Sequence, residues 1–363
     1  MITFYNPHLF VGGAETLIYR ISVELRKREF VTQVAFKTCS DTMKSLFVEA
    51  GIPLIDAKKC LNNMDENNVV VVFSLMDYVK FKQRSFFRKN IKVILYVVGM
   101  YTLTIQRLQS HHLLFPLLKP AISYCIMHEI EKKHIIFMDR IGISATEKFY
   151  QTSYGLADSD MFPLPVDVFP LQDSFCEKAA RNRKPFSILS VTRADFPFKG
   201  YLKGLIEVCT QLCRDHPIQL TIISYGVDID QLHQWIDMAK DDGFSDITLI
   251  GETPYHELEK YILSSNLYIG MGTTVLEAAA RGIPTIAVQS HTYALNANHL
   301  FWEESGRIGG NPAETISPAQ PLIERVLSMS DMEYIDTMKR TEYALRELYS
   351  MDSFMEKFLP LIS

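Results

Sequence analysis

The chain lacks the features that mark secreted, membrane-spanning and disulfide-stapled proteins. None of its apolar runs approaches the ~20 residues that a helix needs to cross a bilayer. Its six cysteines follow neither a zinc nor a disulfide spacing, which indicates a reduced, cytosolic protein. The sequence opens on a strand-like run, Ile2–Tyr5, in place of a secretion signal. We therefore expect a cytoplasmic protein that is soluble or, at most, peripheral at the inner face of the membrane.

Two further absences narrow the classes of ligand. The glycine pair near the N-terminus does not form the G-x-G-x-x-G pattern, so dinucleotide binding is not indicated. The D-x-D strings at residues 158–160 and 228–230 lie before a domain junction and at a helix start, where acids suit the helix dipole. We expect neither a metal nor a cofactor. The net charge of −5 and the lack of a recognised motif argue against nucleic acid.

The length and the distribution of charge favour two domains. A chain of 363 residues is long for a single hydrophobic core. Residues 1–165 carry five more basic than acidic side chains, whereas residues 166–363 carry ten more acidic than basic ones. This unequal charge indicates that the two parts of the chain bind different partners.

Short apolar runs alternate with amphipathic segments in both halves. Val69–Phe73 and Val93–Val98 are continuous apolar runs, typical of strands buried on both faces. The pattern stops at the prolines of residues 162–167 and restarts with a predicted strand, Ser187–Val191. Alternating strands and helices indicate parallel sheets covered by helices. We predict an α/β protein with two Rossmann-like domains whose strand ends meet at a central cleft, where such sheets bind ligands.

The most informative segment is Met271–Val288, which we interpret as a glycine loop, a helix start and a buried strand. Gly272, Thr273 and Thr274 would present backbone N–H groups at the positive end of that helix, an arrangement that favours an anion such as a phosphate. Glu277 lies about one turn into the helix, within reach of hydroxyls on the bound molecule. A second interpretation stays open, because Thr274 and Glu277 also match the capping box of an ordinary helix.

Three other loops follow predicted strands. Arg193 comes just after the strand Ser187–Val191, and Lys199 follows a proline-containing turn, so that two cations converge as a diphosphate requires. Gly251 directly follows the strand Ile247–Ile250. Near the N-terminus, the pair Gly12 and Gly13 opens the first helix and would let a ligand approach the backbone closely.

These motifs occur in the order and approximate spacing of a known enzyme family. They are Gly12-Gly13-Ala14-Glu15, the pair formed by Arg193 and Lys199-Gly200, and Val275–Pro284. Over essentially its whole length the chain resembles the retaining GT-B glycosyltransferases of glycosyltransferase family 4, also called glycosyl transferases group 1. The resemblance implies a GT-B fold with an acceptor-binding domain at residues 1–164, onto which the C-terminal helix 346–363 packs back. It places a nucleotide-sugar donor domain at residues 165–345.

The resemblance also implies roles for individual residues. Arg193 and Lys199 are expected to be the catalytic residues that bind the donor diphosphate, and Glu277 is expected to bind the donor ribose. His8, in the first loop, is a further candidate for the cleft. The glycine loops that approach the donor sugar and phosphates would supply the remaining donor-binding residues, namely Gly12, Gly13, Gly251, Gly272, Thr273 and Thr274.

The sequence departs from the family pattern in three places. The E-x7-E motif has an earlier glutamate that contacts the donor sugar, and counting back from Glu277 gives Ile269 at that position. A histidine often follows the fourth strand of the first domain, but Tyr96–Tyr101 contains none. The Arg193 to Lys199 spacing is one residue longer than usual. These departures put the pattern of sugar recognition in doubt.

The implied activity is transfer of a sugar from a nucleotide-diphosphate sugar, expected to be a UDP-sugar, with retention at the anomeric carbon and without a metal. The expected acceptor is a saccharide or a lipid-linked saccharide, as in surface polysaccharide synthesis. Two alternatives stay open. One is a nucleotide-sugar epimerase of the same fold, which would need acid and base carboxylates. The other is a non-catalytic GT-B subunit that binds or activates a partner glycosyltransferase, consistent with the missing glutamate and histidine.

Residues 79–92 form a basic aromatic segment that interleaves six basic residues with three phenylalanines. Segments of this composition can lie on anionic membrane surfaces. An ordinary solvated helix has the same composition, so both interpretations stay open. We expect the first domain to contact an anionic membrane surface through this segment if its acceptor is lipid-linked.

Overall fold

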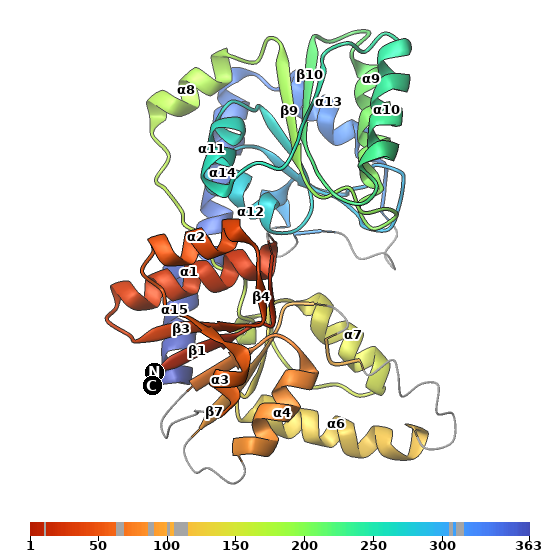
Figure 1. Ribbon diagram of the computed structural model, residues 1–363. Helices are drawn as coiled ribbons and strands as arrows, with labels where there is room; N and C mark the ends of the chain where they lie inside the picture. Colours follow the sequence, from red (N-terminus) through yellow and green to blue (C-terminus); the bar gives the residue numbers. More distant parts are fainter. Residues whose placement is uncertain are drawn as a thin grey trace. The chain divides into compact units, whose positions relative to one another are not determined.

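The computed structural model describes residues 1–10, 12–62, 69–85, 91–99, 102–104, 115–304, 308–309 and 316–363. The chain divides into two compact units, each built around a parallel β-sheet (Figure 1). Unit 1 comprises Met1–Pro165 together with Met351–Ser363, and unit 2 comprises Val166–Ser350. Within the described residues, no helix combines the length and the apolar composition needed to cross a membrane.

Six parallel strands form the main sheet of unit 1, in the order β5-β3-β1-β6-β7-β8. The valines of β6 are all buried, as expected for a parallel strand with helices on both faces. A separate two-stranded parallel ladder forms where the chain continues after β1 and after β3. The strands are β1 (Ile2–Tyr5), β3 (Thr32–Phe36), β5 (Leu54–Asp56), β6 (Val69–Val72), β7 (Lys92–Val97) and β8 (Ile135–Phe137), with β2 (His8–Leu9) and β4 (Thr38–Cys39) in the ladder.

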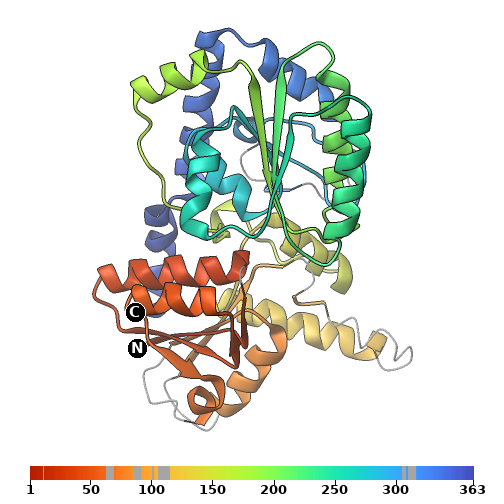
Figure 2. The ribbon, with the colours of Figure 1, turned by 45° about the horizontal axis from the view of Figure 1, so that its top comes forward.

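The helices of unit 1 cover both faces of its sheet. Helices α1 and α2 lie together on one face, and α4 and α6 lie on the other (Figures 1 and 2). Helix α15 belongs to this unit, because the centre of its Phe354 ring lies 6.2 Å from the centre of the Tyr96 ring and 6.4 Å from that of the Phe162 ring. The helices are α1 (Gly13–Lys27), α2 (Asp41–Glu49), α3 (Ala57–Asn62), α4 (Leu75–Ser85), α6 (Phe115–Glu131), α7 (Arg140–Tyr150) and α15 (Met351–Ile362), with a 3-10 turn at Asp158–Asp160.

Five parallel strands form the sheet of unit 2, in the order β11-β10-β9-β12-β13. The central strand β9 pairs with β10 on one side and with β12 on the other. All four residues of β12 are buried, so this strand is part of the core of unit 2. The strands are β9 (Phe186–Val191), β10 (Ile218–Ile223), β11 (Ile247–Ile250), β12 (Leu267–Gly270) and β13 (Thr285–Ala287).

Helices α9 and α10 lie together on one face of this sheet, and α11, α12 and α14 lie on the other (Figures 1 and 2). Helix α8 forms in the stretch that follows the predicted domain boundary, where no element was predicted, because Cys176 and Ala180 give it a buried side against α14. The helices are α8 (Asp173–Arg181), α9 (Tyr201–Leu212), α10 (Ile229–Asp241), α11 (Tyr255–Leu263), α12 (Thr273–Ala280), α13 (Gln320–Ser328) and α14 (Asp331–Tyr349), with a 3-10 turn at Phe301–Glu303.

Strand order locates the place in unit 2 where a ligand would bind. From β9 the chain proceeds to β10 and β11 on one side, and then crosses to β12 and β13 on the other. The connections on the two sides of β9 therefore cover opposite faces of the sheet and leave a crevice at the carboxyl ends of β9 and β12. Open α/β sheets bind their ligands at such a switch point.

Candidate functional site

Four loops gather at the carboxyl edge of the unit 2 sheet. They follow β9, β10, β11 and β12, and they are residues 192–200, 224–228, 251–254 and 271–272. The predicted residues of this unit lie on these loops or on the helix that follows the last of them. Contacts between the loops and helices, described below, tie the four together.

Arg193 and Lys199 lie on the loop after β9, and they are two neighbouring cations. Lys199 is largely buried, and this burial together with the positive charge of Arg193 lowers the pKa of Lys199 to about 8, against a smaller opposite effect of Asp195. The Lys199 ammonium lies 4.7 Å from the centre of the Phe198 ring. Within the described part of the chain, neither cation forms an ion pair. The loop therefore holds positive charge that an anion would neutralise.

The loop after β10 holds this cationic loop in place. The Asp228 carboxylate accepts a hydrogen bond of 2.7 Å from the Phe196 backbone N–H. The backbone N–H of Ala194 donates to the Tyr225 carbonyl at 2.7 Å, and the Asp228 N–H donates to the Ala194 carbonyl at 3.2 Å. Gly226 has a φ of +135°, and a Cβ there would lie only 2.5 Å from the Ala194 carbonyl oxygen. Only glycine fits this close approach.

The D-x-D strings thus have partners within the protein. Asp228 precedes helix α10 but does not cap it, because its carboxylate bonds to the loop after β9. In unit 1, Asp158 forms an ion pair with Arg140 at 2.8 Å, and Asp160 accepts a 2.8 Å bond from the Ala157 N–H. Each of these contacts gives the string a structural role.

Two glycines hold the other end of the cationic loop, next to Lys199. Lys199 is followed by Gly200, and Gly204 lies one turn further along α9. A Cβ on Gly200 would lie 2.7 Å from the Thr292 carbonyl oxygen, and one on Gly204 would lie 2.4 Å from the Leu295 nitrogen. The segment after β13 can therefore lie directly on the first turn of α9. This contact fixes the end of the cationic loop.

Helix α12 begins at the same edge of the sheet, only two residues after β12. Gly272 is its N-cap, with a φ of +83° and no side-chain cap. The Gly272 N–H is already bonded, because it donates to the Ile308 carbonyl at 2.6 Å. The next two N–H groups, those of Thr273 and Thr274, make no backbone hydrogen bond within the described residues. They point out of the helix start, where a negative group is favoured.

The capping-box interpretation of Thr274 and Glu277 is wrong. Thr274 is the second residue of α12, and its hydroxyl donates to the Val191 carbonyl at 3.1 Å. The same hydroxyl lies 2.5 Å from the buried Tyr268 phenol oxygen. Because Val191 ends β9, this bond fixes the start of α12 next to the strand that carries Arg193.

Glu277 lies in the second turn of α12, with only 7% of its side chain exposed. It accepts a 3.1 Å hydrogen bond from the Tyr255 phenol, and its second oxygen lies 3.5 Å from the guanidinium of Arg281. The sequence prediction missed both partners. A signal existed for each: Tyr255 starts the helix after β11, and Arg281 lies at the i+4 position from Glu277.

Gly251 and Gly272 both border open space. Apart from the adjacent residues in the chain, a Cβ added to either glycine would meet no atom of the described residues within 4 Å. Both glycines therefore leave room for a molecule at the edge of the sheet, although the Gly272 N–H itself is taken by Ile308.

Counting along the sequence placed the missing glutamate at Ile269, and the structure explains why no carboxylate is there. Ile269 lies inside β12, fully buried in the core of unit 2. The connection from β12 to α12 consists of Met271 and Gly272 alone. Position 269 is therefore a core position, and a charge there would lack the solvation it needs.

The remaining predicted residues lie in unit 1. Gly12 is the N-cap of α1 and Gly13 is its first residue, so both follow the carboxyl end of β1. The Glu15 carboxylate folds back over Gly12 and accepts a 3.0 Å bond from the Asn6 amide. His8 is exposed, with its Nδ1 2.8 Å from the Thr38 hydroxyl.

The place where a family histidine was expected is occupied by tyrosine and glycine. Tyr96 is fully buried in β7, and its phenol donates a hydrogen bond to the Phe162 carbonyl. Met100 and Tyr101 lie outside the described residues, as do residues 86–90 of the basic aromatic segment. Of that segment, Lys80 and Arg84 are exposed, Lys80 forms an ion pair with Asp77 at 3.0 Å, and Lys82 forms one with Glu129 at 2.7 Å.

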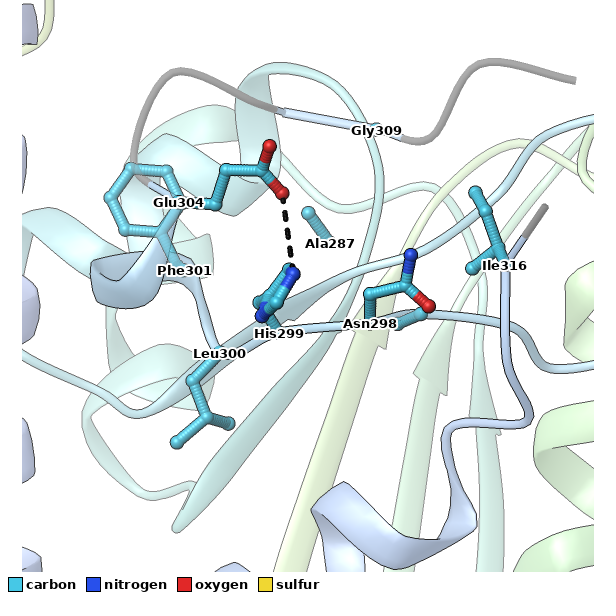
Figure 3. Close-up of a pocket in the computed structure, with 9 residues that line it drawn as sticks. Ala287, Asn298, His299, Leu300, Phe301, Glu304, Gly309 and Ile316 are labelled. Atoms are coloured by element: carbon cyan, nitrogen blue, oxygen red, sulfur yellow. Dashed lines mark ion pairs between the residues drawn. The ribbon is translucent and has the colours of Figure 1, made fainter. Parts of the chain in front are cut away.

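A small cavity lies after β13 (Figure 3). His299 and Glu304 point toward one another beside it, 3.8 Å apart, while Asn298 precedes His299 in the chain and Ile316 comes from a neighbouring segment. Its volume is about 30 Å³. This is room for about two water molecules. The cavity is therefore too small for a nucleotide or a sugar.

Comparison with known proteins identifies the fold. Residues 172–300 match the family model described as glycosyl transferases group 1. HepE from Anabaena, solved with UDP and glucose, is similar with 13% identity and a TM-score of 0.67, over 99% of this chain and 98% of that chain. A glycosyltransferase from Rickettsia africae is similar with 14% identity and a TM-score of 0.66, over 99% and 97%.

Sucrose-phosphate synthase from Thermosynechococcus elongatus is similar with 13% identity and a TM-score of 0.64, over 99% of this chain and 97% of that chain. A comparison with curated protein sequences gave no significant match. The structural matches confirm the predicted GT-B fold class.

The hydrogen bond between Asp228 and the Phe196 N–H can be tested to show whether the D-x-D string at residues 228–230 has a structural role. Replacing Asp228 by Ala should lower the free energy of unfolding by about 1–3 kcal/mol, because the partly buried Phe196 N–H loses its acceptor. Amide hydrogen exchange at Phe196 should become faster. Asp230→Ala, in the same string but exposed, should change stability by less than about 0.5 kcal/mol. Equal effects of the two variants would contradict the structural role of Asp228.

Proposed function

We propose that this chain is a glycosyltransferase that uses a UDP-sugar and transfers the sugar with retention at the anomeric carbon. The observation that carries the proposal is the pair of cations Arg193 and Lys199 near the start of α12, which form no ion pair among the residues that the structure describes. The match of residues 172–300 to the glycosyl transferases group 1 model supports the activity. The complex of HepE with UDP supports the choice of nucleotide.

The proposed chemistry is the departure of a diphosphate. The bond between the anomeric carbon and the β-phosphate oxygen breaks, and its electron pair stays on the diphosphate. A bond to the acceptor oxygen forms on the same face, and the acceptor hydroxyl passes its proton to the departing phosphate oxygen. Arg193 and Lys199 stabilise the charge that develops, together with the N–H groups of Thr273 and Thr274. These groups take the part that a metal ion takes in other transferases.

Glu277 completes the proposed donor site. Its carboxylate lies in the second turn of the helix whose start would hold the phosphates. Ribose hydroxyls donate hydrogen bonds to a carboxylate, and bonds to a charged acceptor are the stronger kind. Phosphate and ribose recognition would therefore come from the start and the second turn of one short helix, α12.

The acceptor is proposed to be a saccharide, lipid-linked in the form that surface polysaccharide synthesis uses. A membrane contact through residues 79–92 fits such an acceptor. In the described part of that segment, Lys80 and Arg84 are exposed, and so is the apolar side chain of Val79. Basic and apolar groups side by side match an anionic lipid surface.

Replacing Arg193 or Lys199 by Ala should lower kcat/KM for sugar transfer while the protein keeps its fold. The loss of one charged contact to the developing diphosphate should cost about 2–4 kcal/mol in the transition state. Lys203→Ala is the matched control, because Lys203 is an exposed lysine on α9 that pairs with Glu207. Near-normal transfer by both site variants would place the donor elsewhere, and loss of activity with a chelator would contradict the metal-free chemistry.

UDP affinity should depend on the protonation of Lys199. Its pKa is lowered to about 8, so the charged form is lost as pH rises through that value. Because the diphosphate binds the charged form, UDP affinity should fall between pH 7 and pH 9, by up to about tenfold. Isothermal titration calorimetry would measure this fall. Lys199→Arg stays charged and should flatten the profile, and a slope shared by both proteins would come from another group.

The membrane proposal predicts salt-sensitive binding to anionic vesicles. Changing Arg84, Arg88 and Lys89 to Gln should reduce co-sedimentation with phosphatidylglycerol liposomes, and added salt should do the same. Lys80 and Lys82 are kept because of their ion pairs with Asp77 and Glu129. The control changes three exposed lysines elsewhere in unit 1 to Gln, namely Lys44, Lys58 and Lys59. Equal losses in both variants would show a non-specific effect of charge.

A further inference from the structure

The Glu277 carboxylate is held from two sides by residues of two helices. Tyr255, the first residue of α11, donates its phenol proton to Oε1 at 3.1 Å. Arg281, at the end of α12, lies 3.5 Å from Oε2. A carboxylate with 7% of its side chain exposed needs such partners, because burial without them disfavours its charge.

Arg281 is itself held in position. Its Nε and Nη2 donate to the Glu259 carboxylate at 3.3 and 3.1 Å, and its guanidinium lies 5.1 Å from the centre of the Phe169 ring. The remaining nitrogen, Nη1, is buried and makes no hydrogen bond in the described part of the chain. It is the nitrogen closest to Glu277. Glu259 thus fixes the orientation of the planar guanidinium, and the guanidinium in turn fixes the position of the Glu277 carboxylate.

We propose that Tyr255 and Arg281 are positioning residues that fix the Glu277 carboxylate to recognise the vicinal diol of a ribose, and that Tyr255 sets the preference for ribonucleotides over deoxyribonucleotides. The inference rests on the proposed use of a UDP-sugar. It adds two residues to that site and narrows its ligand to a ribonucleoside diphosphate.

The direction of the Tyr255 hydrogen bond gives the selectivity. A phenol has one proton, and Tyr255 donates it to Glu277, so toward a ligand the phenol oxygen can only accept. Glu277 as a carboxylate also only accepts. The pair therefore selects a ligand that offers hydroxyl donors side by side, as the 2′ and 3′ hydroxyls of ribose do. A ligand without one of these hydroxyls loses one hydrogen bond to the pair, which lowers its affinity.

Tyr255→Phe tests the proposal, because it removes the phenol oxygen and keeps the ring. Kd values for UDP and 2′-deoxy-UDP are measured by calorimetry for both proteins. The wild type should prefer UDP, and the variant should bind UDP about three- to tenfold more weakly with little change for 2′-deoxy-UDP. Tyr261→Phe is the matched control, since it removes a phenol from the same helix where the ring packs under Lys260.

Arg281→Lys is the second variant, because it keeps a positive charge and loses the planar fork. It should also reduce the preference for UDP over 2′-deoxy-UDP, with the diphosphate contacts unchanged. Equal weakening of both nucleotides, or an unchanged ratio in Tyr255→Phe, would show that these residues only join the helices and would overturn the inference. A wild type that binds no UDP would overturn the proposed function itself.

Discussion

Strand β9 is the constraint on which the arrangement of unit 2 depends. It pairs with β10 on one side and β12 on the other, so the loops after all three strands leave the sheet at one edge. The Val191 carbonyl at its end accepts the Thr274 hydroxyl and so fixes the start of α12. Two residues later the chain reaches Arg193. Positive charge from a side chain and from a helix start therefore meets at one place because of a single strand.

This concentration of charge acts against the stability of the protein without a ligand. The pKa of Lys199 is lowered to about 8, chiefly by the burial of its ammonium and then by the positive charge of the neighbouring, exposed Arg193. The unfolded chain therefore binds this proton more tightly than the folded one, and stability from this group falls as pH drops toward 8. In the proposed donor site, a bound diphosphate would favour the protonated lysine and offset the repulsion between the two cations. The repulsion that lowers the stability of the protein by itself would then add to its affinity for a diphosphate.

Much of the fold and part of the site followed from the sequence. Continuous apolar runs such as Val69–Val72 predicted buried parallel strands, and the rule that ligands bind at strand ends singled out the loop of Arg193 and Lys199. Residues whose role depends on tertiary contacts were missed. Asp228 was interpreted as a helix start, and its bond to the Phe196 N–H follows only from the neighbouring positions of β9 and β10.

Sequence spacing showed that a carboxylate is missing, and the structure gives the physical context. The E-x7-E count leads to Ile269, and because only Met271 and Gly272 separate β12 from α12, this position lies inside the buried strand. In a donor site of the proposed kind, contacts to the sugar hydroxyls must then come from other segments. Phosphate binding in such a site requires a helix start in a fixed position. The short connection provides it, since it joins a buried strand directly to the start of α12.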